Sequence, residues 1–212
     1  MPTKQQRPVS NPLGLAVLAL LYEKSMHPYE MAATLKERHK DESIKLNYGS
    51  LYTVIGALER AGWISAREKL RQGARPERTV YAITAAGEAE LESWMRELVS
   101  TPIKEYPHFE AALSLLPILP PDEAKTLLQQ RVRLLEEELE RQRRKREEAC
   151  SQGLHRLFQI EGEYYAAMLD AERAWVLELI RLIGAVPSFT RDWKAWHERR
   201  SGTKSARPAV KR

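Results

Sequence analysis

The chain has 212 residues, 34 of them basic and 29 acidic, and its apolar content of 43% suits one or two soluble folded domains. Its longest apolar run, residues 13–22, is about half the ~20 residues that a membrane-spanning helix needs, and the polar first residues lack a signal-peptide core. We therefore expect neither a membrane protein nor a secreted one. The one cysteine, Cys150, cannot form an internal disulfide, which fits a reducing cytoplasm.

The charge is divided along the chain. Residues 1–86 hold 13 basic and 8 acidic side chains, residues 87–190 hold 13 and 19, and residues 191–212 hold 8 and 2. The net charges of these segments are +5, −6 and +6. Such asymmetry is typical of a chain whose parts have separate tasks.

Three helices are predicted before residue 62. Residues 12–23 are apolar on nearly every face and predict a buried helix. Pro28 and the apolar residues that follow it at helical spacing predict a second helix that ends near Lys40. Residues 47–50 supply capping side chains for a third helix, which carries Leu51, Ile55 and Leu58 on one stripe and ends at Gly62.

A β-hairpin and a fourth helix follow. The β-prone runs 63–68 and 79–83 flank a turn at 73–76 and predict a hairpin with a basic tip. Thr84 starts a helix that closes the unit near Val99. This order is that of a winged helix-turn-helix, so residues 10–99 are predicted to be a DNA-binding domain.

The rest of the chain predicts helices only. A linker covers residues 100–107, and a helical domain covers 108–190, with a short apolar helix and long amphipathic patterns that begin at residues 122 and 154. The basic stretch 191–212 is predicted to be a disordered tail. The predicted fold class is therefore mostly α with a small β-hairpin.

In a winged helix-turn-helix, one helix enters the major groove and the hairpin reaches the neighbouring DNA backbone. The third helix is then the recognition helix, and four of its residues face away from the apolar stripe: Ser50, Thr53, Ala57 and Arg60. Tyr52 lies beside that stripe, so it either packs against the core or reaches a phosphate. The predicted DNA contacts are Tyr29, Lys45, Asn47, Tyr48, Ser50, Tyr52 and Thr53, with Arg71, Arg75 and Arg78 in the wing.

Four sequence blocks resemble a known family. They read LGLAVLALL at 13–21, HPYEM at 27–31, GSLY at 49–52 with LERAGWI at 58–64, and RP at 75–76 followed by YAITAAG at 81–87. Together and in this order they resemble the PadR family of bacterial transcriptional regulators, in its larger form with a C-terminal helical dimerisation domain. Pro28 and Ala74 stand where that family often has glycine, and Ala74 leaves the turn at the wing tip open.

The resemblance implies a homodimeric repressor in the bacterial cytoplasm that binds a palindromic operator, commonly its own. It also implies that a small aromatic effector, such as a phenolic acid, binds near the dimer interface and releases the DNA. The predicted dimerisation residues are Leu128, Val132, Leu135, Leu139, Tyr165, Leu169, Trp175 and Leu179. The first four repeat in steps of four and three along a seam too short for an independent coiled coil.

Several other features favour ordinary structural roles. The aromatic and sulfur side chains Trp94, Tyr164, Tyr165, Met168 and Trp175 line either an effector pocket or the core, and helical spacing favours the core. The five histidines, His27, His39, His108, His155 and His197, lack the spacing of metal ligands, and Cys150 has no redox partner motif. No catalytic motif or cofactor fingerprint is present, so we expect neither an enzyme nor a bound cofactor. The alternative function is a winged-helix module that binds protein, although the clustered basic residues of the wing disfavour it.

The basic wing generates the first prediction. Arg75→Ala should weaken binding to every DNA sequence and lower the slope of log affinity against log salt by about one unit, because one phosphate contact is lost. A salt titration of DNA binding measures this slope. An unchanged slope would remove Arg75 from the set of phosphate contacts.

Overall fold

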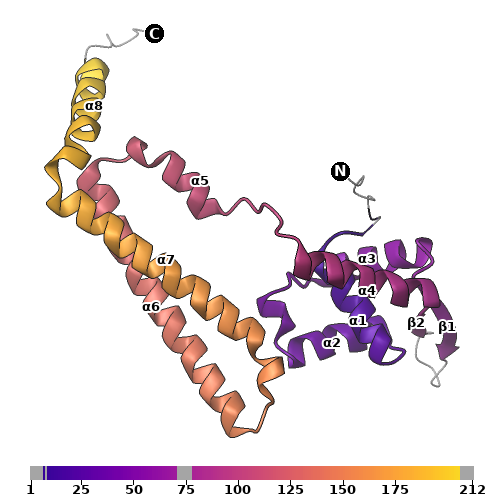
Figure 1. Ribbon diagram of the computed structural model, residues 1–212. Coiled ribbons are helices and arrows are strands. Elements are labelled where there is room, and N and C mark those ends of the chain that lie inside the picture. Colours follow the sequence, from indigo (N-terminus) through magenta and orange to yellow (C-terminus); the bar gives the residue numbers. More distant parts are fainter. Residues whose placement is uncertain (1–6, 8, 71–77, 206–212) are drawn as a thin grey trace, which may run out of the picture. The chain divides into compact units, whose positions relative to one another are not determined.

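The computed structural model describes residues 7, 9–70 and 78–205, and the chain divides into unit 1, Met1–Lys104, and unit 2, Glu105–Arg212 (Figure 1). The boundary lies inside the predicted linker, residues 100–107. Within the described residues the structure is mostly helical and has one sheet of two antiparallel strands. This confirms the predicted fold class. The predicted wing tip at residues 73–76 lies outside the described residues.

Unit 1 is built around helix α1, Pro12–Glu23. The Asn11 side chain caps its start by accepting a hydrogen bond from the backbone N–H of Gly14 at 2.9 Å. The helix is buried on several faces, with Val17 and Leu18 fully inaccessible, and it packs against α3, α4 and β2. The prediction of a buried helix at 12–23 is confirmed.

Helices α2, Pro28–Glu37, and α3, Tyr48–Arg60, form the helix-turn-helix pair. Pro28 stands at the first position of α2, and the His27 ring accepts a hydrogen bond from the N–H of Tyr29 at 3.1 Å. A 3-10 turn, η1 at Lys40–Glu42, occupies the connection. Helix α2 therefore ends before Lys40, and His39 between them has a left-handed backbone conformation.

The hairpin is joined closely to the helices on both sides. Strands β1, Ile64–Leu70, and β2, Arg78–Ile83, pair in antiparallel register from Ile64 opposite Ile83, with a bulge between Ala66 and Glu68. Tyr81 also exchanges two backbone hydrogen bonds of 3.0 Å with Met26. These bonds fix the base of the wing against the loop that precedes α2.

Helix α4, Ala85–Ser100, begins where β2 ends, and Thr84 caps it as predicted. The Thr84 hydroxyl accepts from the N–H of Gly87 at 3.1 Å and donates to the carbonyl of Gly62 at 2.7 Å. A Cβ atom added to Gly87 would lie 2.0 Å from the Trp63 carbonyl oxygen. Glycine at this position is therefore a condition for the close approach of α4 to the start of β1.

Unit 2 contains α5, His108–Ser114, the 3-10 turn η2, Leu116–Ile118, and the long helix α6, Pro121–Ser151. A turn with Gly153 in the left-handed region leads through η3, Arg156–Phe158, to α7, Ile160–Ala185. Helices α6 and α7 pack side by side along their apolar stripes (Figure 1). The predicted pattern from 154 is thus helical from 160, because the glycine turn and η3 occupy its first residues.

The last helix differs from the sequence prediction. Helix α8 spans Pro187–Ser205, where a disordered tail was predicted from residue 191. The Trp193 indole donates to the carbonyl of Leu119 at 2.8 Å, and the His197 ring lies 2.8 Å from the carbonyl of Pro117. These contacts hold α8 against η2, and the basic composition alone did not reveal them. Residues 206–212 lie outside the described part.

No helix in the described ranges has the length and apolar character that crossing a membrane requires.

The contact of Gly87 with Trp63 generates the second prediction. Gly87→Ala should lower the free energy of unfolding by about 1–3 kcal/mol or more, because the added methyl group overlaps a backbone carbonyl that cannot move aside. The control is Gly56→Ala in helix α3, where the nearest atom to the new Cβ is the mobile end of Arg60 at 3.4 Å.

Gly56→Ala should leave stability unchanged or raise it by up to about 1 kcal/mol, because alanine favours the helix. Urea unfolding followed by circular dichroism measures both variants. Equal stability of the two would show that the close approach at Gly87 is not required.

Candidate nucleic-acid interface

The start of helix α3 is exposed and carries donors on its backbone. The Asn47 side chain accepts from the N–H of Ser50 at 2.7 Å, and its carbonyl accepts from the N–H of Leu51 at 3.0 Å. The N–H groups of Tyr48 and Gly49 have no partner among the described residues. Because free N–H groups and the helix dipole favour negative charge, this end of α3 suits a phosphate oxygen.

One face of α3 is buried and the opposite face is polar. Four residues at helical spacing form the buried face: Leu51, Val54, Ile55 and Leu58. Ser50, Thr53 and Arg60 are exposed as predicted, whereas Ala57 is half-buried against the core. Val54 completes the stripe because it follows Leu51 by three residues, a spacing the predicted stripe had left out.

The serine and the threonine on the exposed face of this helix differ in their bonding. Thr53 donates to the carbonyl of Gly49 at 2.9 Å, so its proton is engaged within the helix. The Ser50 hydroxyl has no hydrogen bond within the described part of the chain. Ser50 therefore keeps both a donor and an acceptor available to a ligand.

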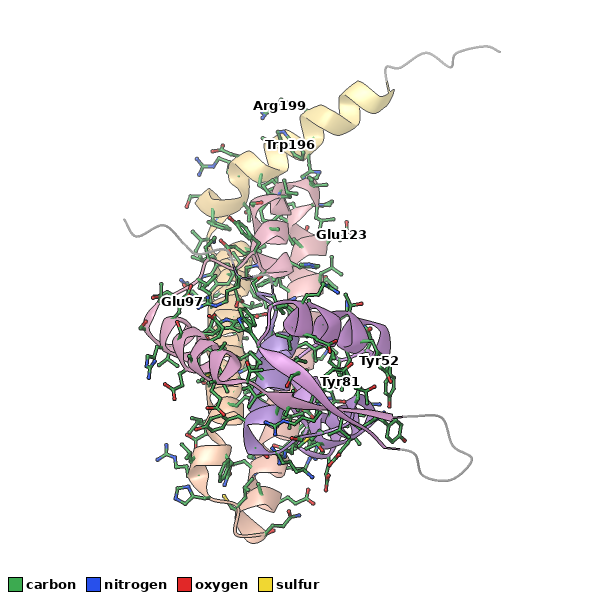
Figure 2. All side chains as sticks on the ribbon, turned by 90° about the vertical axis from the view of Figure 1, so that its right-hand side faces the viewer. Tyr52, Tyr81, Glu97, Glu123, Trp196 and Arg199 are labelled. Atoms are coloured by element: carbon green, nitrogen blue, oxygen red, sulfur yellow. The ribbon has the colours of Figure 1, made fainter. Side chains whose placement is uncertain are left out.

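Tyr52 is 56% exposed, so the structure favours the solvent-facing alternative over packing in the core. It extends from α3 near Tyr81 of strand β2 (Figure 2). Burial raises the pKa of Tyr81, and the nearby Glu59 carboxylate adds to this effect. Tyr81 therefore stays neutral at the base of the wing.

Tyr29 and Tyr48 bring the starts of α2 and α3 together. Their rings stack with centroids 6.5 Å apart, and the rings are 63% and 48% exposed. The Lys36 ammonium lies 5.7 Å from the centre of the Tyr48 ring, within the range of a cation–π contact. The sequence prediction missed Lys36, although it follows Tyr29 by seven residues and so shares its face of α2.

The exposed cations near α3 fall into paired and unpaired groups. Arg38 donates to both carboxylate oxygens of Glu23 at 2.6 and 2.7 Å, and these bonds lower the pKa of Glu23. Lys24 pairs with Glu30. Lys45, directly before α3, is exposed and forms no ion pair among the described residues. Its charge is therefore available to a phosphate.

The structure describes only part of the predicted wing contacts. Arg71 and Arg75 lie outside the described residues, and Arg78 begins strand β2, opposite Leu70. The backbone of β1 and β2 thus leads to the predicted basic tip.

The predicted dimerisation residues fall into two groups. Leu139 is half-buried. Five others are buried: Leu128, Val132, Leu135, Leu169 and Leu179. Leu128, Val132 and Leu179 belong to the core between α6 and α7 of the same chain. Tyr165 and Trp175 are about half exposed. Within one chain, α7 therefore supplies the partner surface that the short seam of α6 needs.

The proposed aromatic pocket is divided between the units. Trp94 is buried in the core of unit 1, with the Arg7 guanidinium 5.4 Å from the centre of its ring. Tyr164, Tyr165, Met168 and Trp175 are exposed on α7, where Trp175 meets Phe109 edge to face. Trp94 therefore serves the core, and the four residues of α7 form an exposed surface.

Neither the histidines nor the cysteine form a cluster. In the ranges that the structure describes, no group of three or more His, Cys, Asp or Glu side chains could hold a metal ion. His27 and His155 cap the starts of helical segments. Cys150 is exposed, and its sulfur lies 3.5 Å from the Gln159 side-chain oxygen.

Comparison with known proteins agrees with this geometry. Residues 17–93 match the model of the transcriptional regulator PadR-like family. A probable transcriptional regulator of Mycobacterium tuberculosis is 34% identical over 89 residues, which cover 40% of this chain and 44% of that protein. The chain thus matches less than half of the length of this curated relative.

Solved structures share the fold. The crystal structure of Bacillus subtilis PadR with operator DNA has a TM-score of 0.63 and 21% identity, and the match covers 81% of this chain and 98% of that one. The crystal structure of the same protein with p-coumaric acid has a TM-score of 0.60 and 17% identity, and the match covers 82% of this chain and 98% of that one. The structure of the Vibrio cholerae virulence activator AphA has a TM-score of 0.59 and 14% identity, and the match again covers 82% of this chain and 98% of that one.

Proposed function

We propose that unit 1, whose residues 17–93 match the PadR-like family of transcriptional regulators, binds double-stranded DNA through helix α3 and the β1–β2 wing. The matched family is one of transcriptional regulators, which supports the expectation that the protein is not an enzyme. The observation that carries the proposal is the first turn of α3, where an unengaged Ser50 hydroxyl and free N–H groups stand on an exposed, nearly uncharged face. Such a face can approach base edges closely.

The surroundings of α3 support separate roles for two sets of contacts: contacts to phosphates would position the protein on DNA, and contacts to bases would read the sequence. Lys45 is exposed just before the helix start and forms no ion pair with the residues that the structure describes, and Tyr29, Lys36 and Tyr48 form an exposed cluster near that end of α3. These groups and the predicted arginines of the wing would hold phosphates, which fixes the register of the protein on DNA. Ser50 and its neighbours would then read the bases.

We further propose that the protein is a homodimeric repressor of its own or a neighbouring promoter in the bacterial cytoplasm. Solved relatives include a complex with operator DNA, a complex with p-coumaric acid and a virulence activator. The first supports an operator as target, and the second supports a small aromatic effector. A reporter fused to the upstream DNA separates repression from activation by the sign of its response to deletion of the gene.

Exposed apolar residues on α6 and α7 support self-association. Leu127 and Leu134 lie two helical turns apart on α6 and are about half exposed. Tyr165, Met168 and Trp175 share one stripe of α7 and are equally exposed. Apolar side chains aligned on exposed stripes are typical of surfaces that a second chain covers.

The difference between the two hydroxyls generates the third prediction. Ser50→Ala should weaken binding to the DNA upstream of the protein's own gene about five- to tenfold, which corresponds to a loss of about 1 kcal/mol from one hydrogen bond. Thr53→Val is the matched control, because its hydroxyl proton is already bound to Gly49 and valine keeps the shape of the side chain.

Thr53→Val should change affinity less than Ser50→Ala. Footprinting and electrophoretic shift assays measure both variants on specific and unrelated DNA. Absence of specific binding by the unaltered protein at any salt concentration would contradict DNA recognition and favour a winged-helix module that binds protein.

The exposed stripe of α6 generates the fourth prediction. Leu134→Glu should shift the protein toward the monomer and lower operator affinity by about a hundredfold or more, because two linked binding domains become one. Gln129→Glu adds the same charge at another exposed position of α6 and should leave the dimer intact. Light scattering after gel filtration measures the mass, and a dimer that survives Leu134→Glu would exclude this stripe as the interface.

A further inference from the structure

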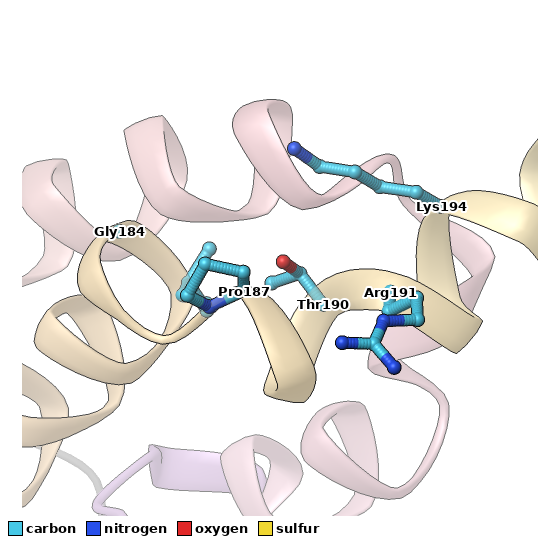
Figure 3. A pocket seen from close by; sticks show the side chains of 6 residues that line it. Gly184, Pro187, Thr190, Arg191 and Lys194 are labelled. Carbon is cyan, nitrogen blue, oxygen red and sulfur yellow. The ribbon is translucent and has the colours of Figure 1, made fainter.

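A hollow of about 270 Å³ lies in unit 2, where α7 leads into α8 (Figure 3). Its wall combines apolar, hydroxyl and cationic groups from the last turns of α7 and the first two turns of α8. The lining residues are Ile183, Gly184, Pro187, Thr190, Arg191 and Lys194. Arg191 and Lys194 lie in the segment that was predicted to be a disordered basic tail, and Thr190 directly precedes that segment.

Thr190 is the unusual residue of this wall. It is 4% exposed and is the one buried polar residue found in the described part of the chain. Its hydroxyl forms no hydrogen bond with the described residues. Every solvent-inaccessible side-chain N or O atom in the described part has a hydrogen-bond partner, so this hydroxyl is accessible and faces the hollow. Figure 3 shows its oxygen between Pro187 and Lys194. Because this hydroxyl has no protein partner among the described residues and faces the hollow, it keeps a donor and an acceptor available to a ligand there.

Three cations lie at or beside the wall of the hollow. Arg191 and Lys194 come from α8, one and four residues after Thr190. Lys125 of α6 lies beside Gly184, because a Cβ added to that glycine would be 2.9 Å from the Lys125 Nζ atom. None of these three cations forms an ion pair within the described part of the chain. Three cations without a carboxylate partner favour a ligand with more than one negative charge.

The start of α8 adds to this preference. Helix α8 has 19 residues, and Pro187 occupies its first position beside the hollow. The dipole of a helix of this length favours an anion at its start. Ile183 and Pro187 supply apolar surface on the remaining wall, which suits a small organic group attached to the anion.

We propose that this hollow binds a small phosphate monoester. The phosphate, with a charge of about −1.5 to −2 at neutral pH, would lie among Arg191, Lys194 and Lys125 and accept a hydrogen bond from Thr190. Its organic group would pack on Ile183 and Pro187. A ligand bound in this way links α8 to α7 and α6, so it would fix α8 in the place where Trp193 already holds it. The site depends on residues of unit 2 and is independent of the proposed DNA contacts.

The test is calorimetric titration of the full chain with phenyl phosphate, inorganic phosphate and benzoate. Phenyl phosphate should bind at least about tenfold more tightly than benzoate, which has the same ring and one negative charge. Inorganic phosphate should bind more weakly than phenyl phosphate, because it lacks the apolar group.

Variants of the wall locate the binding site. Arg191→Gln and Thr190→Val should each weaken phenyl phosphate about tenfold, since each removes one bond to a charged oxygen. Thr190→Ser keeps the hydroxyl and should retain binding. Arg133→Gln removes an equal charge from an exposed position of α6 outside the hollow and serves as the matched control. Circular dichroism of each variant confirms that the helices are retained.

Three results would overturn the proposal. These are no binding of phenyl phosphate at millimolar concentration, equal binding of benzoate, and an equal loss of affinity in Arg133→Gln and Arg191→Gln. The last result would indicate nonspecific attraction by the basic surface. DNA binding by the same samples reports separately on the proposed function, so the two proposals fail independently.

Discussion

Helix α1 is apolar on nearly all of its faces, so it is stable in water only when other elements cover it from several sides. Helices α3 and α4 and strand β2 provide that cover. Each of them contributes its own apolar face to α1 and is thereby left with its polar face toward solvent. The orientation of the candidate recognition helix is thus a consequence of burying α1, and no separate interaction is required to expose Ser50 and Thr53.

The same constraint extends to the wing. Strand β2 is held to Met26 by two backbone hydrogen bonds, and α4 approaches Trp63 so closely that Gly87 can carry no side chain. The hairpin base and the helix pair therefore form one rigid body within unit 1. If unit 1 binds DNA as proposed, the start of α3 and the base of the hairpin would meet the duplex at a fixed spacing.

Much of unit 1 could be predicted from local signals. Pro28, Asn47, Gly62 and Thr84 mark element boundaries through capping and turn chemistry, and the structure places boundaries at each of them. The parts that escaped prediction depend on contacts distant in sequence. Helix α8 is held by hydrogen bonds from Trp193 and His197 to carbonyls more than seventy residues earlier in the chain. Amino-acid composition cannot indicate such long-range bonds. Lys36 was missed because its partner, Tyr48, belongs to the next helix.

Unit 2 shows why a hydrophobic repeat does not by itself identify an interface between chains. The stripe that contains Leu128 and Val132 is regular enough to suggest a partner chain, yet α7 of the same chain covers it. The residues left exposed on α6, Leu127 and Leu134, border that stripe and follow the same seven-residue period. A helix that alternates buried and exposed leucines in this way has two apolar surfaces, and intrachain pairing satisfies only one. The second surface is therefore the one on which self-association of this chain would depend.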